Sequence, residues 1–131
     1  MLSVDEAITS RRSVRAFKSD PVSHDTVAHI LEVASRAPSG TNMQPWHVHV
    51  LTGDALTGLC DAVLDAFWNE PEKHEASRLH YLEKNRDPYL ARRRKVGWDM
   101  YGLLGIGKGE HEKTREFHAR NFKFFNAPVG M

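Results

Sequence analysis

Four polar side chains within one five-residue segment near the start of the chain could bind a compact anion. They are Arg11, Arg12, Ser13 and Arg15. A guanidinium group is permanently charged, and its planar fork fits a phosphate or carboxylate with two hydrogen bonds. The alternative is a solvated basic helix end, where the cations only complement the helix dipole. The segment by itself leaves both interpretations open.

An uncharged polar stretch follows about 25 residues later, at residues 37–46 (APSGTNMQPW). It combines turn-forming residues with amide and hydroxyl groups, which can offer donors and acceptors to a neutral heterocycle. An ordinary connection between a helix and a strand has a similar composition. This loop alone therefore does not decide between the two interpretations either.

The hydrophobic pattern predicts the elements that position these two segments. Ser3 and Glu6 form a capping box that starts a short helix ending at the arginines. A second helix begins after Ser23 and ends by Ala37, because Pro38 disfavours helix at the residue before it. The polar loop is therefore expected to leave a helix directly.

The next segments alternate between strand and helix patterns. Strict alternation predicts a strand over Trp46–Thr52, and Asp54 is expected to cap an amphipathic helix that Pro71 stops. Cys60 lies on the apolar stripe of that helix, which predicts a buried, unreactive thiol. A final stretch, Ala127–Met131, is typical of the opening of a buried strand, and we expect the chain to be the N-terminal portion of a longer domain.

The charged stretch between these regions predicts exposed helices. One or two helices are expected over 72–95, interrupted near Asp87-Pro88, with the basic run 92–95 as a solvated face. A flexible loop is expected at 105–109, and a further helix over Glu110–Phe125. The few apolar anchors of the charged stretch are Leu79, Tyr81, Leu82 and Tyr89.

Composition narrows the class of protein. The 131 residues are 40% hydrophobic and 27% charged with a net charge of +1, which indicates one globular domain, residues 1–131. A single cysteine favours a reducing compartment, and no signal peptide or apolar span is visible, so we expect a cytoplasmic protein without a membrane partner. The near-neutral charge and the lack of basic–aromatic interleaving argue against a nucleic-acid partner, although a module using the two basic segments is the competing class.

Several common chemical motifs fail on inspection. Residues 102–109 approach a phosphate-binding P-loop, but Gly109 stands where a magnesium-binding hydroxyl is needed. Two His-Glu pairs begin like zinc-protease helices, but Arg78 and Arg115 occupy the place of the second histidine, so no metal site is expected. No acid, base and nucleophile set is visible, so no catalytic side chain is assigned. An enzyme with this sequence would need a cofactor to supply the chemistry.

Taken together, the arginine segment and the loop at 37–46 resemble the flavin-dependent nitroreductase family, as does Phe124–Gly130 near the end. The resemblance implies an α+β fold with a mainly antiparallel central sheet flanked by helices, incomplete in this chain, with 72–109 as a variable middle region. It further implies a homodimer with FMN at the interface. In this resemblance Arg11 and Ser13 would hold the FMN phosphate, Arg12 would support the segment, and Arg15 would reach the pyrimidine end of the flavin. The residues that would line the flavin ring, largely from the other subunit, are Pro38, Ser39, Asn42 and Gln44.

The implied reaction is a ping-pong hydride transfer from NAD(P)H through FMN to a nitroaromatic or quinone-like acceptor. Arg15 would stabilise the negative charge that flavin reduction leaves at the pyrimidine end. Flavin reductase, reductive dehalogenase or flavin-fragmenting chemistry and a non-catalytic fragment are the alternatives, and the sequence names neither the acceptor nor the preferred nicotinamide.

Two further expectations concern the acceptor and the cofactor. Phe67, Trp68, Trp98 or Tyr101 could wall the acceptor pocket, although Phe67 is expected to be core. We also expect the 131-residue chain alone to bind FMN weakly.

Overall fold

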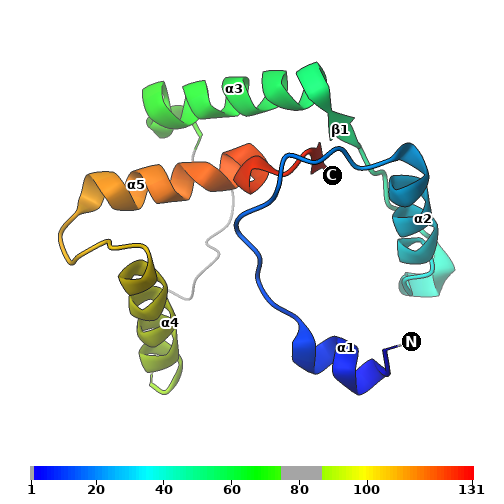
Figure 1. Cartoon of the computed structure of the whole chain (residues 1–131), viewed down its shortest axis with the longest axis horizontal. Helices are drawn as coiled ribbons and strands as arrows, with labels where there is room; N and C mark the ends of the chain where they lie inside the picture. Colours follow the sequence, from blue (N-terminus) through cyan, green and yellow to red (C-terminus); the bar gives the residue numbers. More distant parts are fainter. Residues whose placement is uncertain (1, 75–86) are drawn as a thin grey trace. The chain divides into compact units, whose positions relative to one another are not determined.

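The computed structural model describes residues 2–74 and 87–131. The chain divides into two compact units, each of which is described by itself: unit 1 comprises Met1–Cys60 and Lys123–Met131, and unit 2 comprises Asp61–Phe122. The described elements are mostly helices, with 3₁₀ turns between them and a two-stranded antiparallel sheet (Figure 1).

Local signals start the first two helices of unit 1. In α1 (Val4–Ser10) the Ser3 backbone N–H donates to Glu6 Oε2 at 2.7 Å and the Glu6 N–H donates to Ser3 Oγ at 3.2 Å, so the predicted capping box is confirmed. The second helix, α2 (His24–Ala34), begins at the predicted cap Ser23. The starts of both helices are therefore encoded by residues nearby in the sequence.

The sheet of unit 1 joins the middle of the chain to its end. Strand β1 (Leu51–Thr52) pairs antiparallel with β2 (Val129–Gly130). The strand predicted over Trp46–Thr52 is therefore confirmed only for its last two residues. The reason is that a ladder extends only as far as its partner, and β2 is two residues long. The predicted strand near the C-terminal end is confirmed.

Gly130 lets β2 lie close to two side chains of unit 1. A Cβ at this position would stand 2.8 Å from Leu56 Cδ1 and 3.1 Å from the ring of Phe124. Leu56 is one of the two buried hydrophobic residues of unit 1, and Val27 is the other among the described residues. Leu56, Phe124 and Gly130 therefore form a small apolar cluster at the sheet.

Helix α3 (Gly53–Asn69) follows β1 directly (Figure 1). It begins two residues earlier than expected, at Gly53 with a φ of +51°, so Asp54 lies inside the first turn and the prediction that it caps the helix was wrong. Glycine adopts this left-handed backbone without a Cβ penalty, which allows the sharp turn out of the strand. The helix ends before Pro71 as predicted, and η2 (Pro71–Lys73) follows.

Two more α-helices complete the described part of unit 2. Helix α4 (Tyr89–Leu103) starts after Pro88, at the place where the sequence predicts an interruption, and the residues that would precede the interruption lie outside the described part of the chain. The expected anchors at positions 79, 81 and 82 lie outside the described residues. The helix predicted over Glu110–Phe125 is confirmed only for α5 (His111–Ala119).

The chain beyond α5 forms η3 (Arg120–Asn126) instead of continuing the α-helix. Phe124 and Phe125 have φ values of 48° and 52°. A right-handed helix cannot pass through left-handed residues, and this is why the predicted longer helix breaks. The sequence offers no proline or glycine at the break, so the pattern alone could not reveal it.

Aromatic packing holds unit 2 together. Phe117 of α5 is buried and packs edge-on against Tyr101 of α4, with ring centroids 6.1 Å apart. Phe67 of α3 lies 5.0 Å from the ring of Phe122. The second half of α3 and α5 run side by side (Figure 1), and Arg115 of α5 donates to the carbonyl oxygen of Phe67 at 3.1 Å. Unit 2 thus has contacts between elements distant in sequence.

Candidate functional site

The arginine segment leaves α1 as an exposed, extended stretch. Arg11 Nη1 donates to Ser13 Oγ at 3.3 Å, so the structure brings together a guanidinium and a hydroxyl that were both predicted to contact an anion. Among the described residues, no acidic side chain forms an ion pair with Arg11. Its charge therefore stays available for an external ligand.

Arg12 has a different role from its neighbours. Its Nη1 donates to the carbonyl oxygens of Thr9, Ser10 and Arg11 at 3.3, 3.4 and 3.2 Å. The last carbonyls of a helix lack partners within the helix, and a cation there satisfies them and complements the dipole. Arg12 therefore fixes the end of α1, from which the arginine segment departs.

Arg15 folds back on the same segment. Its Nη1 donates to the carbonyl oxygen of Ser13 at 3.3 Å. The hydroxyl and the carbonyl of Ser13 thus each receive a guanidinium, one from Arg11 and one from Arg15. The short spacing in the sequence produces a cluster of forked donors around one serine.

The polar loop after α2 is shaped by its own hydrogen bonds. Ser39 Oγ accepts from the backbone N–H of Gln44 at 2.9 Å, and Gln44 Nε2 donates to the carbonyl of Asn42 at 3.5 Å. Three residues have positive φ: Thr41 at 50°, Asn42 at 55° and Gln44 at 49°. Left-handed backbone costs a non-glycine residue about 1 kcal/mol, and such strain clusters at binding loops.

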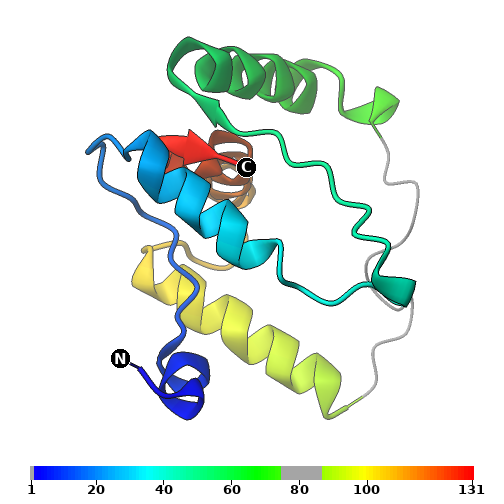
Figure 2. The ribbon, with the colours of Figure 1, turned by 90° about the vertical axis from the view of Figure 1, so that its right-hand side faces the viewer.

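The two predicted sets form two separate clusters in unit 1. Arg11, Ser13 and Arg15 meet in one, and Ser39, Asn42 and Gln44 in the other, with Pro38 at the start of the loop. Figures 1 and 2 show the segment after α1 and the loop after α2 in different places. One ligand could therefore contact both sets only if the loop came from outside this unit 1.

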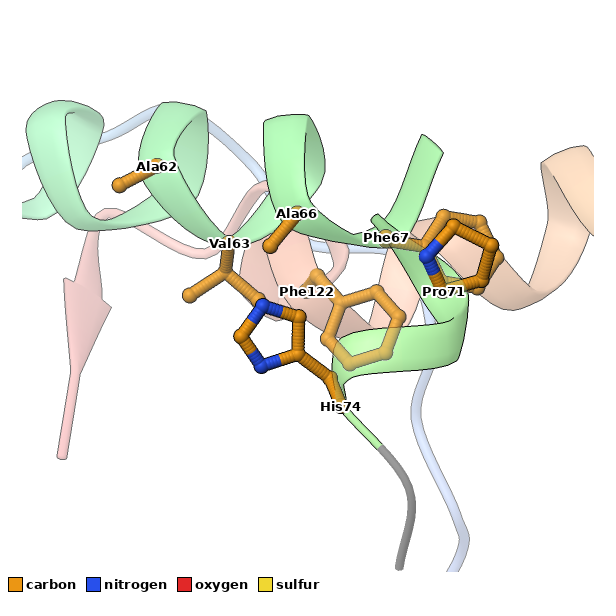
Figure 3. Close-up of a pocket in the computed structure, with 7 residues that line it drawn as sticks. All are labelled: Ala62, Val63, Ala66, Phe67, Pro71, His74 and Phe122. Atoms are coloured by element: carbon orange, nitrogen blue, oxygen red, sulfur yellow. The ribbon is translucent and has the colours of Figure 1, made fainter. Parts of the chain in front are cut away.

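A first cavity of unit 2 is almost wholly apolar. It has a volume of about 620 Å³ and lies between the second half of α3, η2 and Phe122. Figure 3 shows its wall, with the imidazole of His74 beside Val63 and Phe122. The residues that line it are Ala62, Val63, Ala66, Phe67, Pro71, His74 and Phe122.

A second cavity of unit 2 lies along α4. It has a volume of about 640 Å³, and His118 of α5 closes one side. The four aromatic residues that were predicted as candidates for an acceptor pocket lie at three different places in unit 2. Phe67 lines the first cavity, Trp98 and Tyr101 line the second, and Trp68 lies beneath Arg115, whose guanidinium carbon is 4.5 Å from the ring centroid. Their role at an acceptor remains a prediction.

Sequence reasoning missed part of the second cavity. The prediction that the basic run 92–95 is a solvated face is confirmed, since all four residues are exposed, but it did not include that Arg93 and Arg94 line a cavity, and it passed over Gly97 and His118. The signal was present in the helical spacing, because positions 90, 93, 94, 97, 98 and 101 recur at three- and four-residue intervals and therefore share one face of α4.

The described part of the chain offers neither a metal cluster nor a membrane-spanning helix. Within residues 2–74 and 87–131, no group of three or more His, Cys, Asp or Glu side chains is placed to hold a metal ion. No helix in the same part of the chain has the length and apolar character of a membrane span.

Comparison with known proteins identifies the family that this sequence matches. Residues 8–130 match the family model described as the nitroreductase family. A 4-nitrobenzoate reductase of Nocardioides sp. (strain LMS-CY) is 37% identical, over 97% of this chain and 52% of its own length.

Solved structures give the same fold. The FMN and NADPH-dependent nitroreductase NfnB from sphigopyxis sp. strain HMH is 38% identical with a TM-score of 0.88, over 98% of this chain and 57% of that one. The FMN-dependent nitroreductase NfnB from Mycobacterium smegmatis, in complex with NADPH, is 30% identical with a TM-score of 0.85, over 95% of this chain and 55% of that one.

These matches agree on extent as well as on fold. The chain spans about half the length of the relatives and structures it matches. The family model covers almost all of this chain, including the arginine segment and the polar loop. The expected nitroreductase-like fold is confirmed, and the chain belongs to the nitroreductase family.

Proposed function

We propose that this protein is part of an FMN-dependent oxidoreductase that uses NAD(P)H to reduce nitroaromatic or quinone-like acceptors. The observation that carries the proposal is the pairing of the Arg11 guanidinium with the Ser13 hydroxyl, 3.3 Å apart on an exposed segment. Forked guanidinium cations and a hydroxyl donor fit a phosphate dianion well. The names of the relatives, among them a 4-nitrobenzoate reductase and FMN and NADPH-dependent nitroreductases, support the same class of reaction.

The donor set of unit 1 fits the cofactor. Arg11 and Ser13 would hold the phosphate, while Arg12 keeps the segment at a fixed departure from α1 through its three carbonyl contacts. Arg15 would place its positive charge near the pyrimidine end of the ring. When bound, FMN would accept hydride from the nicotinamide and pass electrons to the acceptor.

The loop residues would line the ring system. Pro38, Ser39, Asn42 and Gln44 carry no charge, so they can contact the ring through hydrogen bonds without adding a formal charge beside it. The bond from Gln44 N–H to Ser39 Oγ holds the loop backbone in its strained form before any ligand arrives. Such preorganisation lowers the ordering cost of binding.

A homodimer is part of the same proposal. The anion-binding segment and the loop form separate clusters in unit 1, and a second copy could supply the loop that completes each site (Figure 2). Two equivalent sites would then form at a two-fold interface. We place this dimer in the cytoplasm, where the single cysteine of the sequence stays reduced.

Flavin spectroscopy tests the proposal. The protein is mixed with FMN without oxygen, NADH or NADPH is added, and the visible absorbance of the flavin is followed. We expect the absorbance to bleach and to return on addition of a nitroaromatic. Failure to bleach with either nicotinamide contradicts the proposal. Bleaching that oxygen or free flavin reverses, but nitroaromatics and quinones do not, would favour flavin reductase chemistry instead.

A further inference from the structure

The face of α4 that lines the second cavity combines two kinds of side chain. Its first half carries Arg93 and Arg94, and its second half carries Trp98 and Tyr101. The cavity of about 640 Å³ falls in the range of small-molecule pockets. Among the described residues, no acidic side chain lines it. The cavity is therefore both electropositive and aromatic.

The aromatic half is held in place by neighbouring groups. Tyr101 Oη lies 3.0 Å from His118 Nε2, and the tyrosine ring packs edge-on to Phe117. Trp98 in turn packs edge-on to Tyr101, with centroids 6.3 Å apart and planes at 71°. A planar ring entering the cavity would therefore meet aromatic walls whose positions are already fixed.

Arg94, in the charged half, lacks a counterion among the described residues. Arg94 makes no ion pair or hydrogen bond within the described part of the chain. The nearest acid along the helix, Asp99, is engaged by Lys95 at 2.5 Å, and neither of these residues lines the cavity. The fork of Arg94 can therefore meet an anion without first breaking a bond to an acid.

Gly97 leaves the space between the two halves open. It stands in the middle of α4, where glycine is a poor helix former. A Cβ at this position would have no atom within 4 Å. Close packing among the described residues thus does not account for the glycine, whereas a ligand that needs room beside Trp98 does.

We propose that this cavity binds a planar aromatic ring bearing a carboxylate. Arg94, with Arg93 beside it, takes the carboxylate, and Trp98 and Tyr101 contact the ring over Gly97. Forked guanidinium donors match a carboxylate, and aromatic rings favour edge-on and offset contacts with one another. The inference rests on the proposed function only where it takes this ligand to be the electron acceptor, so that the enzyme would prefer nitroaromatic acids to neutral nitroaromatics.

Calorimetric titration of the full chain with benzoate and with benzamide, its neutral counterpart, tests the binding itself. We expect benzoate to bind more tightly than benzamide. In Arg94→Gln the benzoate affinity falls about tenfold, as expected for loss of a charged hydrogen bond, while the benzamide affinity is unchanged. Arg92→Gln is the matched control on the same helix. Arg92 lies 5.9 Å from the Tyr89 ring centroid and does not line the cavity, so this variant should bind benzoate like the parent.

A second variant separates ligand binding from structure. Gly97→Leu fills the open space and replaces a poor helix former with a good one. We expect it to lose both benzoate and benzamide while its thermal unfolding midpoint does not fall. If Gly97→Leu keeps the parent affinity for both ligands, the ligand does not occupy this space and the proposal is wrong.

The remaining outcomes also decide. The proposal is overturned if benzoate does not bind, or if Arg92→Gln and Arg94→Gln lose the same benzoate affinity. It is also overturned if adenosine 2′-phosphate displaces benzoate at a lower concentration, because the cavity would then bind a nucleotide phosphate. Benzoate binding is measured without flavin. If benzoate binds as expected but the flavin does not bleach, only the proposed function is refuted. Bleaching with no benzoate binding refutes this inference alone.

Discussion

Arginines are held in opposite ways in the two units. In unit 1, Arg11 donates to the Ser13 hydroxyl, Arg12 to the carbonyl of Thr9 and Arg15 to the carbonyl of Ser13, all at nearby sequence positions. In unit 2, Arg115 reaches across 48 positions to the carbonyl of Phe67 and covers the Trp68 ring at 4.5 Å. One set shapes an exposed segment, and the other joins two helices.

The difference separates residues that bind from residues that hold the fold. A guanidinium whose charge faces water can still bind an anion. A guanidinium that donates to carbonyls and packs on aromatic rings already uses its N–H donors within the protein. Arg115 stabilises the folded state through its contacts with the Phe67 carbonyl and the Trp68 ring, which are far from it in sequence. The exposed arginine segment adds little to the free energy of unfolding. Substitutions in the arginine segment and at Arg115 should therefore affect different measurements.

Truncation of the central aromatic residue of unit 2 should have the largest effect. Phe117 is buried at 8% exposure and packs against Tyr101. We expect Phe117→Ala to lower the free energy of unfolding by about 3 kcal/mol, because a buried phenyl is lost and a cavity remains. Urea denaturation followed by near-ultraviolet circular dichroism measures it.

The control for that prediction lies in unit 1. Val14, between the candidate arginines, is 55% exposed, and Val14→Ala should change the free energy of unfolding by less than about 0.5 kcal/mol. Equal losses in the two variants would show that both regions are held by packing, and the contrast between them would disappear.

A substitution that keeps the charge should isolate the fork of Arg115. Lysine cannot donate to the Phe67 and Trp68 carbonyls while covering the Trp68 ring, contacts that arginine makes at 3.1, 3.4 and 4.5 Å. We expect Arg115→Lys to destabilise unit 2 by about 1 kcal/mol. Hydrogen exchange should speed up at the C-terminal turn of α3. Unchanged exchange there would mean that the charge alone suffices.

The sequence predicts those features that depend on neighbours along the chain. The caps at Ser3 and Ser23 and the helix stop before Pro71 need only local chemistry, and the structure has all of them. The strand over Trp46–Thr52 fails for most of its length, because its extent depends on a partner about 80 residues away. The break at Phe124 is equally invisible, since phenylalanine rarely adopts a left-handed backbone and no proline or glycine marks the place.

The same distinction applies to the candidate site. The Arg11–Ser13 pair follows from spacing alone, and the structure reproduces it. The cavity on α4 needs α5 to supply His118 and its contact with Tyr101, so no pattern within one segment could complete it. Proximity along the chain predicts clusters of donors, whereas cavities require the tertiary fold.

Removal of a candidate phosphate ligand should change binding without changing stability. We expect Arg11→Gln to weaken FMN binding about tenfold, because one charged hydrogen bond to the phosphate is lost. Its unfolding midpoint should stay near that of the parent, since the side chain is exposed. Quenching of flavin fluorescence during titration gives the affinity.

The matched control is Arg36→Gln, another exposed arginine of unit 1 outside the segment. It removes the same charge, so it corrects for general electrostatic attraction of an anionic cofactor. A loss of FMN affinity as large as that of Arg11→Gln would indicate that net charge, and not the Arg11–Ser13 pair, accounts for binding.

Acid should have the smallest effect, confined to the helix that leads into the arginine segment. Hydrogen bonding to the Ser3 backbone, and then to its side chain, lowers the pKa of the exposed Glu6 carboxyl from 4.5. The folded pKa lies below the unfolded one, so the contribution of the capping box is fully present above pH 4.5 and is lost as the pH falls through the lowered value. We expect Cα chemical shifts of Ala7 and Ile8 to move toward coil values below that pH. Glu6→Gln keeps an acceptor that does not titrate, so its shifts should stay constant over the same range, and a matching change in this variant would assign the acid effect to another group.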